Sequence, residues 1–241
     1  MSCLQHPWKS WRHIVKLDPD RPIQDKDLIR LGDSGTDAIL IGGTQGITYQ
    51  KTFDLFARLQ RFIPHLPLWQ EISELSAILP ESDGYAIPVV LNTGHVNWII
   101  GHQKAAIEQF GELIPWEKLV VEGYVILNEN SAVAKLTGAK VPNHARGTVA
   151  YAQTAERIFG MDLIYLEYSG SYGNPQWVQA VRDKTNAHLV YGGGIDSADK
   201  AVEMASIADT IVVGNALYEK GIAVVEETAA AVHSINKKRT K

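Results

Sequence analysis

The chain has 241 residues, a formal net charge of −4 at pH 7 and a single cysteine, Cys3. One cysteine cannot form a disulfide within the chain. The composition is slightly acidic and has no cluster of Lys and Arg that could bind the phosphate backbone of a nucleic acid. No stretch approaches the roughly 20 apolar residues of a transmembrane helix, and the N-terminus is not patterned like a secretion signal. We expect one cytoplasmic domain over residues 1–241, with at most peripheral membrane contact and a frayed, basic tail at 236–241.

Short apolar, β-branched runs alternate with segments of helical periodicity along the chain. The runs predict eight strands, at residues 12–17, 37–41, 66–70, 85–91, 120–128, 162–167, 188–191 and 210–213. Between them lie amphipathic segments that predict helices, for example over 49–62 and 149–159. Strands that alternate with helices form parallel sheets, because each helix carries the chain back to the same edge. The fold class is therefore α/β, as a single (β/α)8 TIM barrel.

One interval is too short for a full return helix. Between Gln70 and Tyr85 there is room for only a turn or two of helix once the loops and Pro80 are subtracted. We expect the third helix to be short or missing. A gap in the helical ring would expose apolar barrel wall beside Trp69, Pro88 and the helix that carries residues 98–100, and a long hydrocarbon could lie there. Side chains could equally fill the gap.

Polar residues and glycines follow several of the predicted strands, at the end where a barrel of this type carries its active site. These runs are Tyr165-Leu166-Glu167-Tyr168-Ser169-Gly170, Gly192-Gly193-Gly194 and Val213-Gly214-Asn215. The two glycine turns after the last two strands place bare backbone N–H groups beside helix N-termini, an environment that favours a phosphate. They could also be no more than helix-entry geometry. We expect a substrate that carries a phosphate.

Residues two apart on a strand share a face, which places Lys16 and Asp18 together at the end of the first strand. Asp18 and Thr44, which follows the second strand, form an oxygen pair suited to Mg²⁺, whose shell a substrate phosphate would complete. Lys16 and Asp18 could instead be a structural ion pair, and Thr44 could cap the next helix. The eight histidines show no spacing typical of a metal site.

The same alternation places Tyr165, Glu167 and Ser169 on one face of the sixth strand. A carboxylate in an apolar strand is rarely buried without a partner or a task. We therefore expect Glu167 to be catalytic and to accept a proton from the attacking group.

Together these motifs resemble those of the geranylgeranylglyceryl phosphate synthase family, and are most similar to its bacterial heptaprenylglyceryl phosphate synthase branch. The resemblance runs in order from about Trp8 to Tyr218, through Lys16-Leu17-Asp18-Pro19, Ile41-Gly42-Gly43-Thr44, the 165–170 run, Tyr191-Gly192-Gly193-Gly194-Ile195 and Val213-Gly214-Asn215-Ala216. It implies a barrel without a regular third helix and a homodimeric prenyltransferase. The implied reaction joins a polyprenyl group from its diphosphate to sn-glycerol 1-phosphate through an ether and releases diphosphate.

The resemblance also implies residue roles. It assigns Mg²⁺ to Asp18 and Thr44, although the family often has Ser at the second position. It assigns glycerol 1-phosphate binding to Lys16, Tyr165, Leu166, Glu167, Tyr168, Ser169, Gly170, Gly194, Gly214 and Asn215.

The prenyl groove is expected to involve Trp98 and Ala105 on a helix predicted over residues 95–110. Ala105 lies seven residues, roughly two turns, after Trp98 on the same helical face. In short-chain family members the corresponding position resembles a bulky aromatic stop. The methyl group here therefore predicts a long donor, heptaprenyl diphosphate.

Two other functions stay open at this point. A sugar-phosphate isomerase or synthase would share the glycine turns but would need an acid and a base on separate strands, and residues 125–128, Val-Ile-Leu-Asn, end the fifth strand without a carboxylate. A non-catalytic phosphate-binding barrel would give Glu167 and Asp18 no reason to converge with Lys16.

Overall fold

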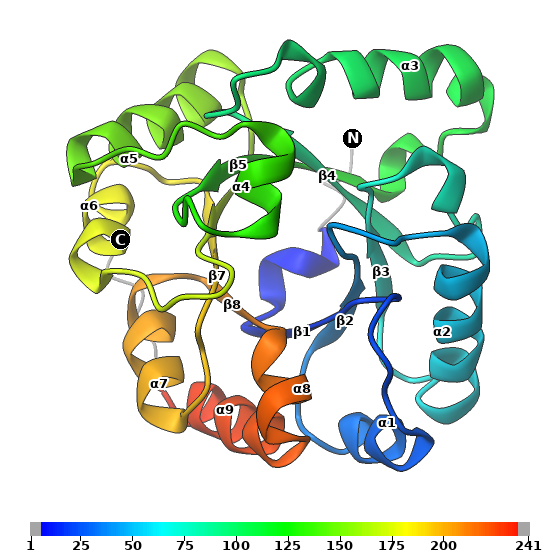
Figure 1. Cartoon of the computed structure of the whole chain (residues 1–241). Coiled ribbons are helices and arrows are strands. Elements are labelled where there is room, and N and C mark those ends of the chain that lie inside the picture. Colours follow the sequence, from blue (N-terminus) through cyan, green and yellow to red (C-terminus); the bar gives the residue numbers. More distant parts are fainter. Residues whose placement is uncertain (1–5, 236–241) are drawn as a thin grey trace.

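In the computed structural model, which describes residues 6–235, eight parallel strands close into one barrel (Figure 1). The strands are β1 (His13–Leu17), β2 (Ala38–Ile41), β3 (Leu68–Glu71), β4 (Gly84–Val90), β5 (Leu119–Ile126), β6 (Leu163–Glu167), β7 (His188–Gly192) and β8 (Thr210–Val213). Neighbours pair in chain order, and β8 pairs with β1 to close the barrel. The predicted TIM barrel is confirmed, whereas the predicted tail at 236–241 lies outside the described residues.

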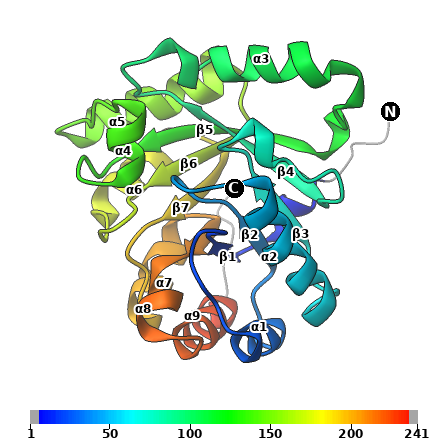
Figure 2. The ribbon, with the colours of Figure 1, turned by 45° about the vertical axis from the view of Figure 1, so that its right-hand side comes forward.

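Helices surround the barrel and connect its strands (Figure 2). They are α1 (Asp25–Gly32), α2 (Tyr49–Phe62), α3 (Gly101–Phe110), α4 (Ala132–Thr137), α5 (Ala145–Gln153), α6 (Pro175–Arg182), α7 (Ala198–Ile207), α8 (Asn215–Lys220) and α9 (Ala223–Ser234). α2 has the bounds predicted from its apolar face, and α5 continues into a π-helical turn, Thr154–Ile158. Within residues 6–235, none of the helices has the length and apolar character needed to span a bilayer.

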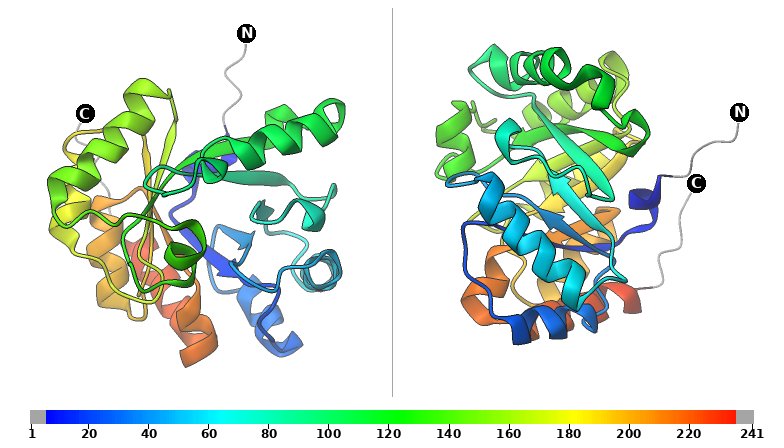
Figure 3. Two further views of the ribbon diagram at one scale, coloured as in Figure 1. Left: turned by 45° about the horizontal axis from the view of Figure 1, so that its top comes forward. Right: turned by 90° about the vertical axis from the view of Figure 1, so that its right-hand side faces the viewer.

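The connection between β3 and β4 departs from a regular barrel. Its residues, all of which the structure describes, contain one short 3-10 turn, Leu75–Ala77, in place of an α-helix. The next helix, α3, lies outside the barrel beside β4 (Figure 3), and none of its described residues is buried. The short third connection is therefore confirmed. Beside α3, Val121 on the outer face of β5 is exposed, and Ile87 of β4 is only partly buried.

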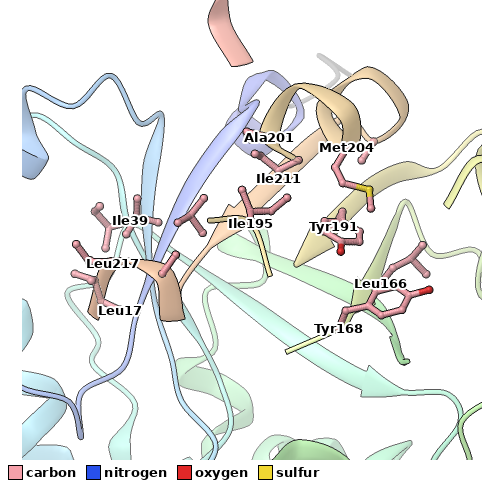
Figure 4. Packing of buried hydrophobic residues seen from close by; sticks show 14 of the residues in the cluster. Leu17, Ile39, Leu166, Tyr168, Tyr191, Ile195, Ala201, Met204, Ile211 and Leu217 are labelled. Atoms are coloured by element: carbon pink, nitrogen blue, oxygen red, sulfur yellow. The ribbon is translucent and has the colours of Figure 1, made fainter. Parts of the chain in front are cut away.

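Two apolar clusters stabilise the barrel. One fills the space between the strands and the surrounding helices, where Leu17, Ile39 and Met204 pack (Figure 4). The other lies inside the barrel and contains Trp11 and Trp69, whose rings meet edge to face with centroids 5.3 Å apart. The indoles fill the end of the barrel where the strands begin. The opposite end, where the strands finish, carries the polar residues and is open.

Candidate active site

A cavity of about 2030 Å³ opens at the carboxyl ends of the strands. One part of it is polar and is lined by Lys16, Asp18, Thr44, Glu71, Tyr165, Glu167, Ser169, Gly170, Gly194, Gly214 and Asn215. The other part is apolar and extends along β4, β5 and α3, where Ile87, Pro88, Trp98, Ala106, Ile107, Phe110 and Val121 line it. The short β3–β4 connection contributes Ile72, Leu75 and Ile78 to the wall. A charged head with a long hydrocarbon tail fits this arrangement.

Glu167 lies buried at the end of β6, where two donors hold its carboxylate. One oxygen, Oε2, accepts a hydrogen bond from the Tyr124 hydroxyl at 2.6 Å, and Oε1 accepts one from the backbone N–H of Ser169 at 2.5 Å. Burial raises the pKa of Glu167 above its ordinary value, although the Lys16 ammonium and the Tyr124 hydrogen bond act in the opposite direction. A fixed carboxylate whose basicity is raised by burial is suited to general base chemistry.

Sequence reasoning missed Tyr124, which comes from β5. Its hydroxyl reaches Glu167 because the closed barrel pairs Tyr124 with Tyr165 across β5 and β6, and the two rings stack with centroids 4.8 Å apart. Tyr124 lies in an apolar run of the sequence. The feature that could have identified it as a site residue is a hydroxyl-bearing aromatic side chain on the inward face of a predicted strand.

Lys16 pairs with Glu71 and not with Asp18, which corrects the ion pair considered from the sequence. The ammonium nitrogen lies 2.6 Å from Glu71 Oε2, and both side chains are largely buried. Burial alone would lower the pKa of Lys16, but the carboxylates of Glu71 and Glu167 outweigh it and raise that pKa. Glu71 is the last residue of β3 and lies one residue beyond the strand predicted at 66–70. A carboxylate at the end of an apolar strand, as at Glu167, is the sequence feature that could have identified it.

The glycine turns after β7 and β8 face the polar part of the cavity. Gly194 has a φ of +59°, and a Cβ there would lie 2.5 Å from the backbone nitrogen of Tyr172. This turn therefore requires glycine. After β8, the side-chain oxygen of Asn215 accepts a hydrogen bond from Arg21 Nη1 at 2.9 Å, which leaves the amide nitrogen as the donor for an anion.

Two members of the 165–170 run do not face the cavity. Leu166 and Tyr168 point into the apolar layer between barrel and helices, as Figure 4 shows. Their side chains therefore do not line the cavity, and binding of glycerol 1-phosphate by these two residues stays a prediction. The reason is strand alternation, because Tyr165, Glu167 and Ser169 take the inward positions.

Trp98 lines the apolar groove, but Ala105 does not, which corrects the sequence expectation. The segment predicted as one helix over 95–110 divides into a 3-10 turn, Val96–Trp98, and α3, which begins at Gly101. The seven-residue spacing therefore does not run along one helix. Ala106 faces the groove, and Ala105 is exposed to solvent.

Asp18 and Thr44 line the cavity side by side with the glycines that follow β2. Asp18 Oδ1 accepts the backbone N–H of Asp20 at 2.9 Å, and a Cβ on Gly43 would lie 2.5 Å from the same oxygen. Burial raises the pKa of Asp18, so a cation would compensate a partly desolvated charge. Within residues 6–235 no group of three or more His, Cys, Asp and Glu side chains could hold a metal. One carboxylate and one hydroxyl fit Mg²⁺ only when substrate oxygens complete its shell.

Comparison with known proteins identifies relatives over almost the whole chain. Residues 6–234 match the model of the PcrB family. Heptaprenylglyceryl phosphate synthase of Geobacillus thermodenitrificans (strain NG80-2) is 46% identical over 222 residues, which cover 90% of this chain and 92% of that protein. The protein of the same name from Brevibacillus brevis (strain 47) is 46% identical over 213 residues, which cover 88% and 91%.

The fold is also similar to a solved structure, (S)-3-O-geranylgeranylglyceryl phosphate synthase from Thermoplasma acidophilum in complex with its substrate sn-glycerol-1-phosphate. The TM-score is 0.82 at 22% sequence identity, with 96% of this chain and 97% of that chain covered. At this identity the likeness concerns the barrel architecture.

Proposed function

The chain belongs to the PcrB family, and on that premise we propose that it is a prenyltransferase. It transfers a heptaprenyl group from its diphosphate to the primary hydroxyl of sn-glycerol 1-phosphate. The bacterial relatives are named heptaprenylglyceryl phosphate synthases, which supports the prenyl group, and the similar solved structure contains sn-glycerol-1-phosphate, which supports the acceptor. The observation that carries this proposal is Glu167, a buried carboxylate in the lining of one cavity that has both a polar and an apolar part.

Glycerol 1-phosphate binds in the polar part of the cavity. The glycine turns at Gly194 and Gly214 take the phosphate through backbone N–H groups, and Lys16 and Ser169 line the space for the glycerol oxygens. Holding the phosphate brings the free primary hydroxyl toward Glu167 and lowers the entropic cost of the reaction.

Glu167 accepts the proton of that hydroxyl as its oxygen attacks carbon 1 of the prenyl chain. A new C–O ether bond forms, and the bond between carbon 1 and the diphosphate oxygen breaks with its electron pair on the diphosphate. The carboxylate charge also stabilises the positive charge that develops on the allylic carbon. Tyr124 and the Ser169 N–H fix the carboxylate for both tasks.

The donor diphosphate lies toward Asp18 and Thr44, which would hold Mg²⁺. When bound, Mg²⁺ neutralises the departing diphosphate. The prenyl chain lies in the apolar groove between the barrel wall and α3. Each buried methylene contributes up to about 0.8 kcal/mol, so a groove of this extent favours a long donor over a short one.

The test is direct. Radiolabelled sn-glycerol 1-phosphate should become extractable into organic solvent when it is mixed with protein, Mg²⁺ and heptaprenyl diphosphate, and should stay in water when the donor is omitted. A sugar-phosphate isomerase or synthase would leave the label in water with either mixture. Residues 125–128, where β5 ends, contain no carboxylate for that alternative, and Glu122 of β5 lies with Trp8 and Trp11 at the closed end of the barrel. The single domain over residues 1–241, the homodimer and the cytoplasmic location stay predictions.

A further inference from the structure

Within residues 6–235, the barrel interior places one ammonium group, that of Lys16, among three buried carboxyl groups. These belong to Glu71, Glu122 and Glu167, whose exposed fractions are 6%, 3% and 5%. The ammonium forms its hydrogen bond with Glu71, at 2.6 Å. A buried ammonium needs an anionic partner, because a lone charge in such an environment is strongly destabilising.

The position of Glu71 is built into the fold. It ends β3 and packs against the loop after β2, where a Cβ on Gly42 would lie 2.9 Å from Glu71 Cβ and 3.2 Å from its Oε2. Oε1 is buried and has no hydrogen-bond partner among the described residues. Leaving an acceptor unpaired is costly, so the contact with Lys16 is what compensates for the buried carboxylate.

We propose that Glu71 is a positioning residue, which holds the Lys16 ammonium away from Glu167 and so keeps Glu167 available as the base. This inference rests on the proposed function. If Glu71 lost its charge, Glu167 would be the carboxylate that acts most strongly on the ammonium. A contact between the two would occupy lone pairs that the glycerol hydroxyl needs and would weaken the base.

The electrostatics of the site support the claim that a closer ammonium would weaken Glu167 as a base. The charge of Lys16 already lowers the pKa of Glu167 against the effect of burial, whereas the charge of Glu71 raises it. Titratable groups that act on Glu167 come from the strands around it, namely Lys16 of β1, Glu71 of β3, Glu122 and Tyr124 of β5, Tyr165 of β6 and Tyr191 of β7.

Glu122 provides a matched control. It is as buried as Glu71 and shares the barrel interior, but it lies with Trp8 and Trp11 at the closed end. Burial, and then the charge of Glu71, raise the pKa of Glu122 well above its ordinary value, which favours the protonated form. Glu122→Gln keeps the shape of the side chain, removes a charge that burial already disfavours, and replaces neither partner of the Lys16–Glu71 contact.

The experiment measures the pH dependence of kcat/KM for ether formation by wild type, Glu71→Gln and Glu122→Gln. The acidic limb reports protonation of Glu167. Glu71→Gln should lower kcat/KM about tenfold or more and move the acidic limb to lower pH, because Glu167 loses a nearby negative charge and gains the ammonium. Glu122→Gln should keep the wild-type limb. A wild-type limb in Glu71→Gln, or equal shifts in both variants, overturns the proposal.

Two further measurements keep the result interpretable. A crystal structure of Glu71→Gln should show the Lys16 ammonium within hydrogen-bond distance of Glu167, and an ammonium that stays at position 71 contradicts the inference. If Glu71→Gln does not fold, Glu71→Asp withdraws the carboxylate by one methylene, and its limb should also move to lower pH; an unmoved limb overturns the proposal. Wild-type protein that forms no ether would instead refute the proposed function.

Discussion

Glu167→Gln removes the charge of the proposed base while preserving its shape. In the wild-type structure both carboxylate oxygens accept hydrogen bonds, from the Tyr124 hydroxyl and from the Ser169 N–H. The glutamine oxygen can keep the backbone contact, and its amide nitrogen can donate to Tyr124, because a phenolic hydroxyl can also accept. We therefore expect a folded variant with an ordered side chain at position 167.

The loss of catalysis should be large. A positioned general base contributes about 10²- to 10⁴-fold to the rate, so kcat should fall at least about a hundredfold, or about 2.7 kcal/mol in activation free energy. The affinity for glycerol 1-phosphate should change little, since the glycine turns and Lys16 remain in place.

Three measurements on the same preparation separate the possibilities. Initial rates with radiolabelled glycerol 1-phosphate give kcat, calorimetric titration gives the affinity for glycerol 1-phosphate, and thermal unfolding reports on the fold. Turnover within a few-fold of wild type by the folded variant would refute the assignment of Glu167 as the base. A lost affinity with an unchanged kcat would show that Glu167 binds the acceptor and does not activate it.

Asp18→Asn should raise the Mg²⁺ concentration needed for half-maximal turnover, and an unchanged Mg²⁺ titration would return Asp18 to a structural role. Ala106→Trp should shift kcat/KM from heptaprenyl toward geranylgeranyl diphosphate, with the exposed Ala105→Trp as control; an unaltered ratio would place the groove elsewhere. Burial, helped by the charge of His233, lowers the pKa of His13 to about 3. The unfolded chain therefore binds more protons below the ordinary histidine pKa, and the free energy of unfolding should fall by on the order of 2 kcal/mol from pH 7 to pH 5 in urea titrations. If the free energy of unfolding of His13→Asn fell by the same amount between pH 7 and pH 5, protonation of His13 could not be the cause.

Local patterns were sufficient to predict the barrel. Each strand is a short apolar run closed by glycine or polar residues, and this signal survives in a single sequence because burial on both faces demands it. The missing third helix followed from chain length alone, since the residues between Gln70 and Tyr85 could not form a full return helix. Inward positions such as Tyr165 and Glu167 follow from strand alternation, whereas the resemblance also assigned binding to Leu166 and Tyr168, which face the helices.

Contacts between distant strands were decided only by the tertiary structure. Lys16 and Glu71 are separated by 55 positions, and Tyr124 and Glu167 by 43. Both pairs meet because barrel closure fixes the register of neighbouring strands and turns their inward side chains toward one interior, which no local pattern encodes. The choice of Ala106 over Ala105 depends likewise on where α3 begins, and one residue on a helix changes the facing direction by about 100°. The sequence by itself thus determined which residues stand at the strand ends. Tertiary packing determined which of them form ion pairs and hydrogen bonds with one another, and which side chains line the groove.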